Sequence, residues 1–134
     1  MLSVLVANRG EIAVRIIRAV HEAGGHAIAV HPADDATSRH VLLADDVVQL
    51  PGAGTAAYLD IEAVTGAAVD RNCAMVHPGY GFLSENPEFA RRCAELGLTI
   101  DLYQPFRDFD STDPERLSAN PRGGGRTVGA LGGP

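Results

Sequence analysis

The chain of 134 residues has no tryptophan, only seven other aromatic residues (three tyrosines, four phenylalanines) and only two cysteines. Two cysteines cannot hold a disulfide-based fold. Cys73 and Cys93 form no CxxC pair, so we expect two buried, reduced thiols. No apolar run approaches the ~18 residues of a membrane-spanning helix, and the first ten residues lack the basic segment of a signal peptide. We therefore expect a cytoplasmic protein with no membrane partner.

Positive charge is also scarce, because 11 lysines and arginines face 17 acidic residues and give a formal net charge of -6. A nucleic-acid partner is therefore not expected, since phosphate binding needs a basic face. The GxGxxG fingerprint of dinucleotide-binding domains is absent. No histidine or cysteine has the spacing of a metal site, and no catalytic residue can be assigned from order alone.

Apolar runs and helical patterns alternate over the first hundred residues. The apolar runs predict five short strands, at 3–7, 27–30, 46–50, 73–76 and 98–100. Between them lie three helical patterns and one short helical turn, at 40–44. Such alternation predicts an α/β fold, a doubly wound Rossmann-like parallel sheet with helices on both faces.

The ends of these helices are predicted from capping residues. Asn8 is placed as the N-cap of the first helix, with Glu11 completing a capping box, and Gly24-Gly25 ends that helix. Asp60 is expected to cap the third helix and Asn86 the last one.

The pattern stops near residue 100, so we divide the chain into a domain at 1–100 and a tail at 101–134. The tail has four prolines and six glycines in 34 residues, near the roughly 25–30% at which disorder is the default. We expect it to be irregular or disordered.

Two segments are more specific than a generic α/β pattern. The first is VANRGEIA at 6–13, followed by Arg15 and Arg18, and the second is HPGYGFLSEN at 77–86. Together with HVLLAD at 40–45 and Tyr58-Leu59, they closely resemble the N-terminal domain of biotin carboxylases, the component that begins with a domain preceding an ATP-grasp fold. The resemblance covers residues 2–99. It implies a family of biotin-dependent acyl-CoA, pyruvate and urea carboxylases.

This resemblance implies an ATP-dependent ligase reaction. Bicarbonate is activated by ATP, in the presence of magnesium, and carboxylates biotin carried on a partner domain. A biotin carboxyl carrier domain and a carboxyltransferase are the implied partners, and a homodimer is the implied assembly. The ATP-grasp continuation is missing after Thr99, so the chain by itself is expected to be inactive. The alternative is a non-catalytic Rossmann-like dimerisation or regulatory module.

The abrupt loss of the family pattern after Thr99 suggests a change of reading frame or an early end of a pseudogene. Arg122-Gly123-Gly124-Gly125-Arg126 superficially resembles a glycine-rich phosphate lid, but it lies too early and has no flanking strands.

The turn Asn8-Arg9-Gly10-Glu11 precedes a helix N-terminus, a place that attracts anions. With only one glycine of a phosphate fingerprint present, we favour a structural turn in which Arg9 ties neighbouring loops together. Direct nucleotide binding is the alternative.

Arg15, Arg18 and Glu22 recur on one face of the same predicted helix. A charged stripe of this kind is usually a solvated face. The family resemblance implies instead that these positions lie at a dimer interface, and both readings stay open.

The loop 77–85 follows the carboxyl end of a strand, where open α/β sheets bind ligands. The resemblance implies that it lines a biotin pocket through the backbone and ring of Tyr80, and through Gly81. Glu85 would order the polar network. The candidate residues are His77, Gly79, Tyr80, Gly81, Phe82 and Glu85. A purely structural loop is the alternative. His31 and His77, each before a proline, are expected to make structural hydrogen bonds.

Overall fold

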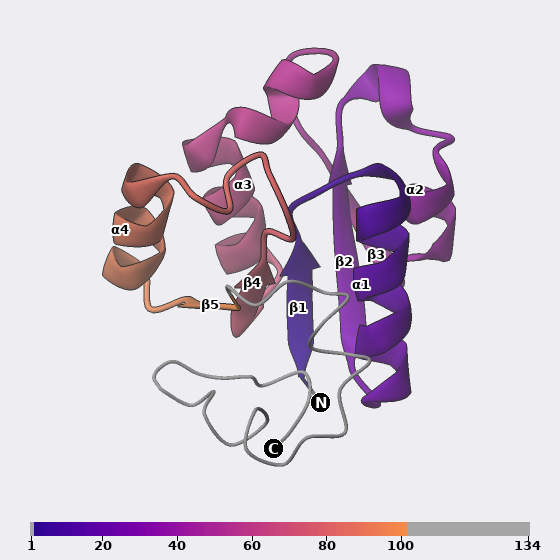
Figure 1. The fold of residues 1–134 in the computed structure, drawn as a ribbon, viewed down its shortest axis with the longest axis horizontal. Coiled ribbons are helices and arrows are strands. Elements are labelled where there is room, and N and C mark those ends of the chain that lie inside the picture. Colours follow the sequence, from indigo (N-terminus) through magenta and orange to yellow (C-terminus); the bar gives the residue numbers. More distant parts are fainter. Residues whose placement is uncertain (1, 102–134) are drawn as a thin grey trace.

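The computed structural model describes residues 2–101, and these form one α/β unit (Figure 1). The strands are β1 (Ser3–Val6), β2 (His26–His31), β3 (Asp46–Gln49), β4 (Met75–His77) and β5 (Thr99–Ile100). The α-helices are α1 (Gly10–Glu22), α2 (Arg39–Leu43), α3 (Ile61–Asp70) and α4 (Pro87–Glu95). Two short 3-10 helices, η1 (Ala33–Asp35) and η2 (Thr55–Leu59), complete the order.

All five strands are parallel and pair in the order β3-β2-β1-β4-β5. The chain first builds outward from β1 to β3, then returns past β1 to add β4 and β5. β1 and β4 are therefore the neighbours between which the direction of building reverses. Open α/β sheets bind ligands outside the carboxyl ends of the strands at such a switch point.

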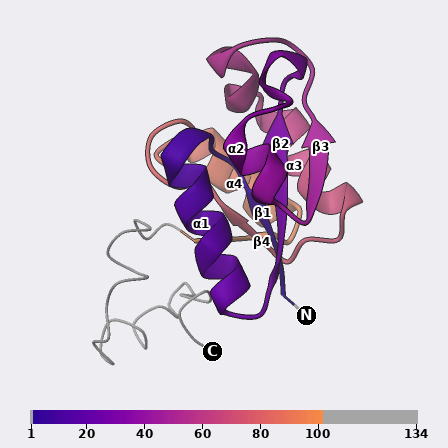
Figure 2. The same cartoon turned by 90° about the vertical axis from the view of Figure 1, so that its right-hand side faces the viewer.

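Helices cover both faces of the sheet, as the sequence predicts (Figures 1 and 2). Successive residues of β1 point to opposite faces. Val4 and Val6 pack with α1, whereas Leu5 and Ala7 belong to the cluster formed with α3 and α4. Strands covered on both faces are continuously apolar, which explains the unbroken runs in the sequence.

The apolar stripe of α1 fills one of these two cores. Ile16 and Ile17 are fully buried against β1, β2 and β4, and each such side chain contributes roughly 1.5–3 kcal/mol. The opposite core is made mainly by α3, α4 and the loop before α4. Its members on these elements are Val64, Ala67, Ala68, Leu83, Phe89 and Cys93.

The predicted capping of α1 is wrong. The helix begins at Gly10, its N-cap is Arg9, and no side chain caps it. Asn8 lies one residue before the N-cap, and its side-chain amide donates to the carbonyls of Pro78 and Tyr80 instead of capping the helix. Glu11 is exposed and faces Arg39 of α2, with 3.6 Å between Nη1 and Oε2.

The other predicted ends are confirmed. Asp60 accepts a hydrogen bond from the backbone N–H of Ala63 at 3.1 Å, and Asn86 accepts one from Glu88 at 2.8 Å. Gly24, after α1, has a left-handed φ of 80°. The two 3-10 helices, η1 and η2, were not predicted, and β4 begins two residues later than predicted, at Met75; the bounds of β1, β2, β3 and β5 differ from the prediction by one residue.

Cys73 and Cys93 are buried free thiols, and burial raises the pKa of each to about 11. Within the described residues, no helix is long and apolar enough to cross a membrane. The predicted irregular tail and the segment 122–126 lie outside the described residues, apart from Asp101, whose N–H donates to the Val76 carbonyl.

Candidate functional site

Two segments meet at the carboxyl ends of β1 and β4. One is the turn from Ala7 to Gly10, and the other is the loop from His77 to Asn86, here called the aromatic loop. The N–H of Ala7 donates to the His77 carbonyl at 2.9 Å, which continues the strand pairing beyond β1. The two sequence segments singled out above thus lie side by side at the switch point.

Asn8 connects them. Its carboxamide N–H groups donate to the carbonyls of Pro78 at 2.7 Å and Tyr80 at 2.9 Å. Its carbonyl oxygen accepts the N–H of Arg9 at 2.8 Å. Asn8 is fully buried, so its polar groups need these partners.

Gly79 lies between the two carbonyls that Asn8 binds. It has a φ of 70°, and an added Cβ would stand 2.8 Å from Asn8 Nδ2 and 2.9 Å from Ile12 Cγ2. Glycine is therefore required here for two separate reasons, the left-handed backbone and the close approach of α1.

The rest of the aromatic loop turns sharply. Gly81 and Phe82 both have left-handed backbones, with φ of 72° and 47°, and the Ser84 N–H closes the turn on the Gly81 carbonyl at 2.9 Å. Such a conformation is costly for a phenylalanine. The Tyr80 side chain is 55% exposed, and Glu85 is also exposed.

A second polar cluster, the Asp35 cluster, lies beside this loop and consists of Arg9, Asp35, Ser38, His40 and Tyr58. The Asp35 carboxylate accepts Nε and Nη2 of Arg9 at 3.1 and 3.3 Å. It also accepts the hydroxyls of Ser38 at 2.5 Å and Tyr58 at 2.7 Å. The hydrogen bond from Arg9 holds the pKa of Asp35 well below its usual range.

The Asp35 cluster reaches the aromatic loop through Tyr58. Its ring contacts the Phe82 ring, with centroids 5.8 Å apart, and the Arg9 guanidinium lies 5.9 Å from the Tyr58 centroid. Burial and the Asp35 hydrogen bond raise the pKa of Tyr58. His40 is buried, and its Nε2 lies 3.2 Å from the Val30 carbonyl oxygen. Burial lowers the pKa of His40.

His77 lies beneath the aromatic loop and is fully buried. Its Nδ1 accepts the Gly79 N–H at 3.1 Å, so the ring proton lies on Nε2, which is 3.7 Å from Asp101 Oδ2. Burial lowers the pKa of His77. His31 Nδ1 is 2.8 Å from the Pro32 carbonyl. Both histidines make the structural hydrogen bonds that we expected.

The structure thus brings together the predicted turn and the predicted loop, and it places Arg15, Arg18 and Glu22 along the helix that follows the turn. Those three lie along α1, with Arg15 half-buried and the other two exposed. Asp35, Tyr58 and His40 were not predicted as parts of this site. Tyr58 and His40 belong to family-like segments, whereas nothing in the polar stretch 33–39 distinguishes Asp35 from Asp34.

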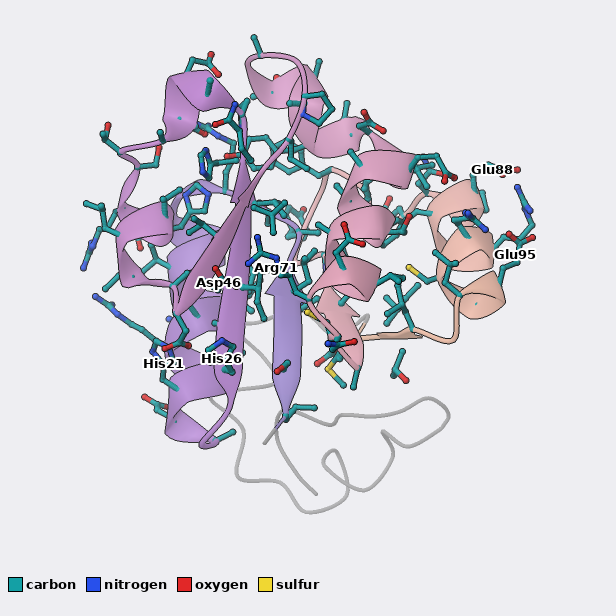
Figure 3. The ribbon with its side chains drawn as sticks, turned by 180° about the vertical axis from the view of Figure 1, so that it is seen from behind. His21, His26, Asp46, Arg71, Glu88 and Glu95 are labelled. Carbon is teal, nitrogen blue, oxygen red and sulfur yellow. The ribbon has the colours of Figure 1, made fainter. Side chains whose placement is uncertain are left out.

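A third polar cluster lies at the amino ends of β2 and β3, and Figure 3 labels its residues His21, Asp46 and Arg71. Asp45 accepts the Ala27 N–H and faces His21 Nε2, both at 2.8 Å, and Asp46 pairs with Arg71. These contacts tie α1 and α3 to the sheet. In the described part of the chain, no group of three or more ligating side chains is arranged to hold a metal ion.

The described residues of the site therefore present a shaped surface. The polar atoms of Asn8 and Asp35 are occupied by internal hydrogen bonds, and the aromatic loop presents the exposed Tyr80 ring. These features define the class: a doubly wound α/β domain that carries a hydrogen-bonded, glycine-rich loop at its switch point.

Comparison with known proteins gives the family. Residues 1–100 match the sequence profile described as "Biotin carboxylase, N-terminal domain". The chain therefore belongs to this family.

Known relatives agree in sequence and in structure. Biotin carboxylase 2, chloroplastic, of Populus trichocarpa is 50% identical over 98 residues, which are 72% of this chain and 19% of the relative. The solved biotin carboxylase domain of a single-chain bacterial carboxylase is 54% identical, with a TM-score of 0.72. That match covers 75% of this chain and 23% of the other.

The biotin carboxylase domain dimer of the Hydrogenobacter thermophilus 2-oxoglutarate carboxylase is 44% identical, with a TM-score of 0.71. The match covers 73% of this chain and 22% of that domain. The Hydrogenobacter structure was solved in complex with MgADP, ADP and bicarbonate. The chain thus spans about a fifth of the length of these three relatives.

Proposed function

We propose that residues 1–100 serve as the N-terminal domain of a biotin carboxylase, an enzyme that carboxylates biotin with ATP and bicarbonate. The observation that carries this proposal is the aromatic loop, which Asn8 holds at the switch point with Tyr80 exposed. In this function the loop forms one wall of the biotin pocket, opposite a wall supplied by the rest of such an enzyme.

The residues of the loop fit biotin as a ligand. The flat Tyr80 ring is exposed and offers an apolar face, and the glycines on either side let the backbone approach a ligand closely. Biotin supplies the nitrogen that accepts the carboxyl group. The loop residues would bind and orient the ring system, and Glu85 would order polar groups around it.

ATP and magnesium fit the described residues poorly. The turn after β1 carries one glycine, and the Arg9 guanidinium is already bound to Asp35, so no phosphate cradle is formed here. We propose that ATP and magnesium are bound by the other domains of a complete enzyme. The 134 residues by themselves are then not a carboxylase.

We propose further that Arg15, Arg18 and Glu22 face a second copy of the domain. The Hydrogenobacter domain, which this chain resembles, was solved as a dimer. A biotin carboxyl carrier domain and a carboxyltransferase are the proposed partners of the complete enzyme. Two buried reduced thiols support a cytoplasmic location.

A domain exchange tests this function. Residues 1–100 replace the equivalent segment of the Hydrogenobacter domain, and ADP formation is measured with and without biotin and bicarbonate. We expect biotin-dependent ADP formation, with Tyr80→Ala raising the KM for biotin roughly tenfold. Leu42→Ala, at an exposed position on α2, is the matched control and leaves that KM unchanged.

A chimera that unfolds cooperatively but shows no biotin-dependent ADP formation contradicts the proposal. The alternative, a non-catalytic dimerisation or regulatory module, then gains weight. It predicts that the 134-residue chain forms a dimer or binds a complete carboxylase. Gel filtration of the chain with and without that carboxylase distinguishes the two functions.

A further inference from the structure

Asn8 lies 70 residues before Pro78 in the chain, yet two of its hydrogen bonds end on the aromatic loop. We propose that Asn8 is the positioning residue of this loop: its carboxamide, rather than the local turn sequence, sets where Tyr80 lies. The inference rests on the proposed function in one respect only, that Tyr80 faces a ligand.

The geometry of the carboxamide supports this role. A primary amide has two N–H donors and one acceptor oxygen, and all three groups of Asn8 are used. The two donors bind the carbonyls on either side of Gly79, so the segment from Pro78 to Tyr80 is clamped at both ends. The side chain is fully buried, which removes competition from bulk solvent.

Helix α1 forms the surface on which the segment held by Asn8 packs. Gly79 packs so closely on Asn8, Ile12 and Ile16 that an added Cβ would approach each of them within 3.2 Å. Ile16 is itself fully buried in the core beneath α1. The position of the loop is therefore tied to the core, and it does not depend on the loop's own contacts alone.

The chemistry demands an amide rather than a carboxylate. In Asn8→Asp the shape is kept, but an oxygen replaces Nδ2 and faces two carbonyl oxygens. Both hydrogen bonds are lost and become repulsive contacts. Asn8→Ser keeps a single donor and is a milder variant, which serves if the aspartate variant does not fold.

The test uses the complete 134-residue chain without any ligand. Amide exchange is followed by NMR at Gly79 and Ser84 in the loop and along β2 in the core. The nuclear Overhauser contact between Gly79 Hα and the Ile12 methyl groups reports the position of the loop directly. Asp60→Ala is the matched control, because it removes one cap hydrogen bond at the start of α3 and none of the hydrogen bonds between Asn8 and the aromatic loop.

In Asn8→Asp we expect the exchange rates of Gly79 and Ser84 to increase roughly thirtyfold more than the rates along β2, the factor that the loss of two hydrogen bonds of typical strength implies. The Gly79–Ile12 contact is expected to disappear. Asn8→Ser is expected to give a smaller change in the same direction, and Asp60→Ala is expected to leave the loop contact intact.

The proposal is overturned if the loop and β2 change by the same factor in both Asn8 variants, or if the Gly79–Ile12 contact survives in both. Neither result depends on biotin. Failure of the domain exchange would therefore remove the proposed function and leave the role of Asn8 standing, and failure of this test would do the reverse.

Discussion

The Asp35 carboxylate and the Arg9 guanidinium form a two-point ion pair between the segments that follow β2 and β1, with distances of 3.1 and 3.3 Å. The pair joins two loops that parallel strands deliver to the same edge of the sheet. Tyr58 adds a third segment through its hydroxyl, 2.7 Å from the same carboxylate. One carboxylate thus organises the surroundings of the aromatic loop.

Replacing Asp35 with asparagine is expected to lower the free energy of unfolding by about 2–3 kcal/mol, since charge-assisted hydrogen bonds are lost and a donor faces donors. Urea unfolding measures the change. The neighbouring Asp34 is exposed and accepts the Gly54 N–H. Asp34→Asn should stay within about 0.5–1 kcal/mol of the parent, and equal effects of the two variants would contradict this account.

Acid is expected to destabilise the chain in two steps. The lowered pKa of Asp35 gives stability that is complete above the unfolded carboxyl value of about 3.9 and is lost as pH falls below it. Buried His40 also has a lowered pKa. Its contribution is complete above about pH 6.5 and declines as pH falls, because the unfolded ring binds a proton more readily.

Unfolding free energies measured from pH 7.5 to pH 3 should show both steps (limits set by the unfolded values of about 6.5 and 3.9). His40→Gln is expected to reduce the first, although His77, whose pKa is also lowered, retains part of it. Asp35→Asn is expected to reduce the second. A profile in which neither variant alters its own step would refute the assignment.

The two glycines of the aromatic loop separate backbone strain from steric clash. Gly79 and Gly81 have nearly equal φ values of 70° and 72°, but only at Gly79 would a Cβ meet other atoms within 4 Å. Gly81→Ala should cost about 1–2 kcal/mol through φ alone. Gly79→Ala should cost about 1–3 kcal/mol more through overpacking. Thermal unfolding of both variants measures the two losses of stability. Equal losses would show that the side chains of Asn8 and Ile12 move aside at little cost to accommodate the added Cβ.

At position 82, glycine is expected to give a more stable protein than alanine, the reverse of the usual order. Its left-handed φ of 47° costs an L-residue about 1–2 kcal/mol, partly offset by the roughly 0.5–1 kcal/mol greater unfolded-state entropy of glycine. Phe82→Gly should therefore be more stable than Phe82→Ala by about 0.5–1 kcal/mol. At Tyr80, where φ is not positive, alanine should be the more stable of the two. The midpoints of urea unfolding of the four variants test whether the stability difference between glycine and alanine has opposite signs at positions 80 and 82.

Much of the fold could be predicted from the sequence because its signals are local. The apolar runs are the buried strands, and the caps at Asp60 and Asn86 are bonded to residues two or three positions away. Boundaries shifted by up to two residues, as at β4, where the Cys73 N–H bonds to the end of α3 instead of joining the sheet.

The site was predicted only in part because its contacts are long-range. Asn8 followed by Glu11 has the local pattern of a capping box, and nothing nearby indicates that Pro78 and Tyr80 will take its side chain instead. Asp34 and Asp35 are equivalent as turn formers, so the selection of Asp35 by Arg9 depends on where β1 and β2 end. Resemblance to a family identified the loop, but it could not supply these partners.

The central position of β1 governs how the polypeptide acquires its structure during synthesis. β1 pairs with β2 about twenty residues later and with β4 about seventy residues later, Val6 being opposite His77. At translation rates of about 5–20 residues per second, β1 waits several seconds for its second neighbour. During that interval the edge of β1 that β4 will occupy is unpaired, and unpaired apolar strands are prone to associate. A nascent chain paused before residue 77 is therefore expected to be a chaperone client, and one paused well beyond β5 is not.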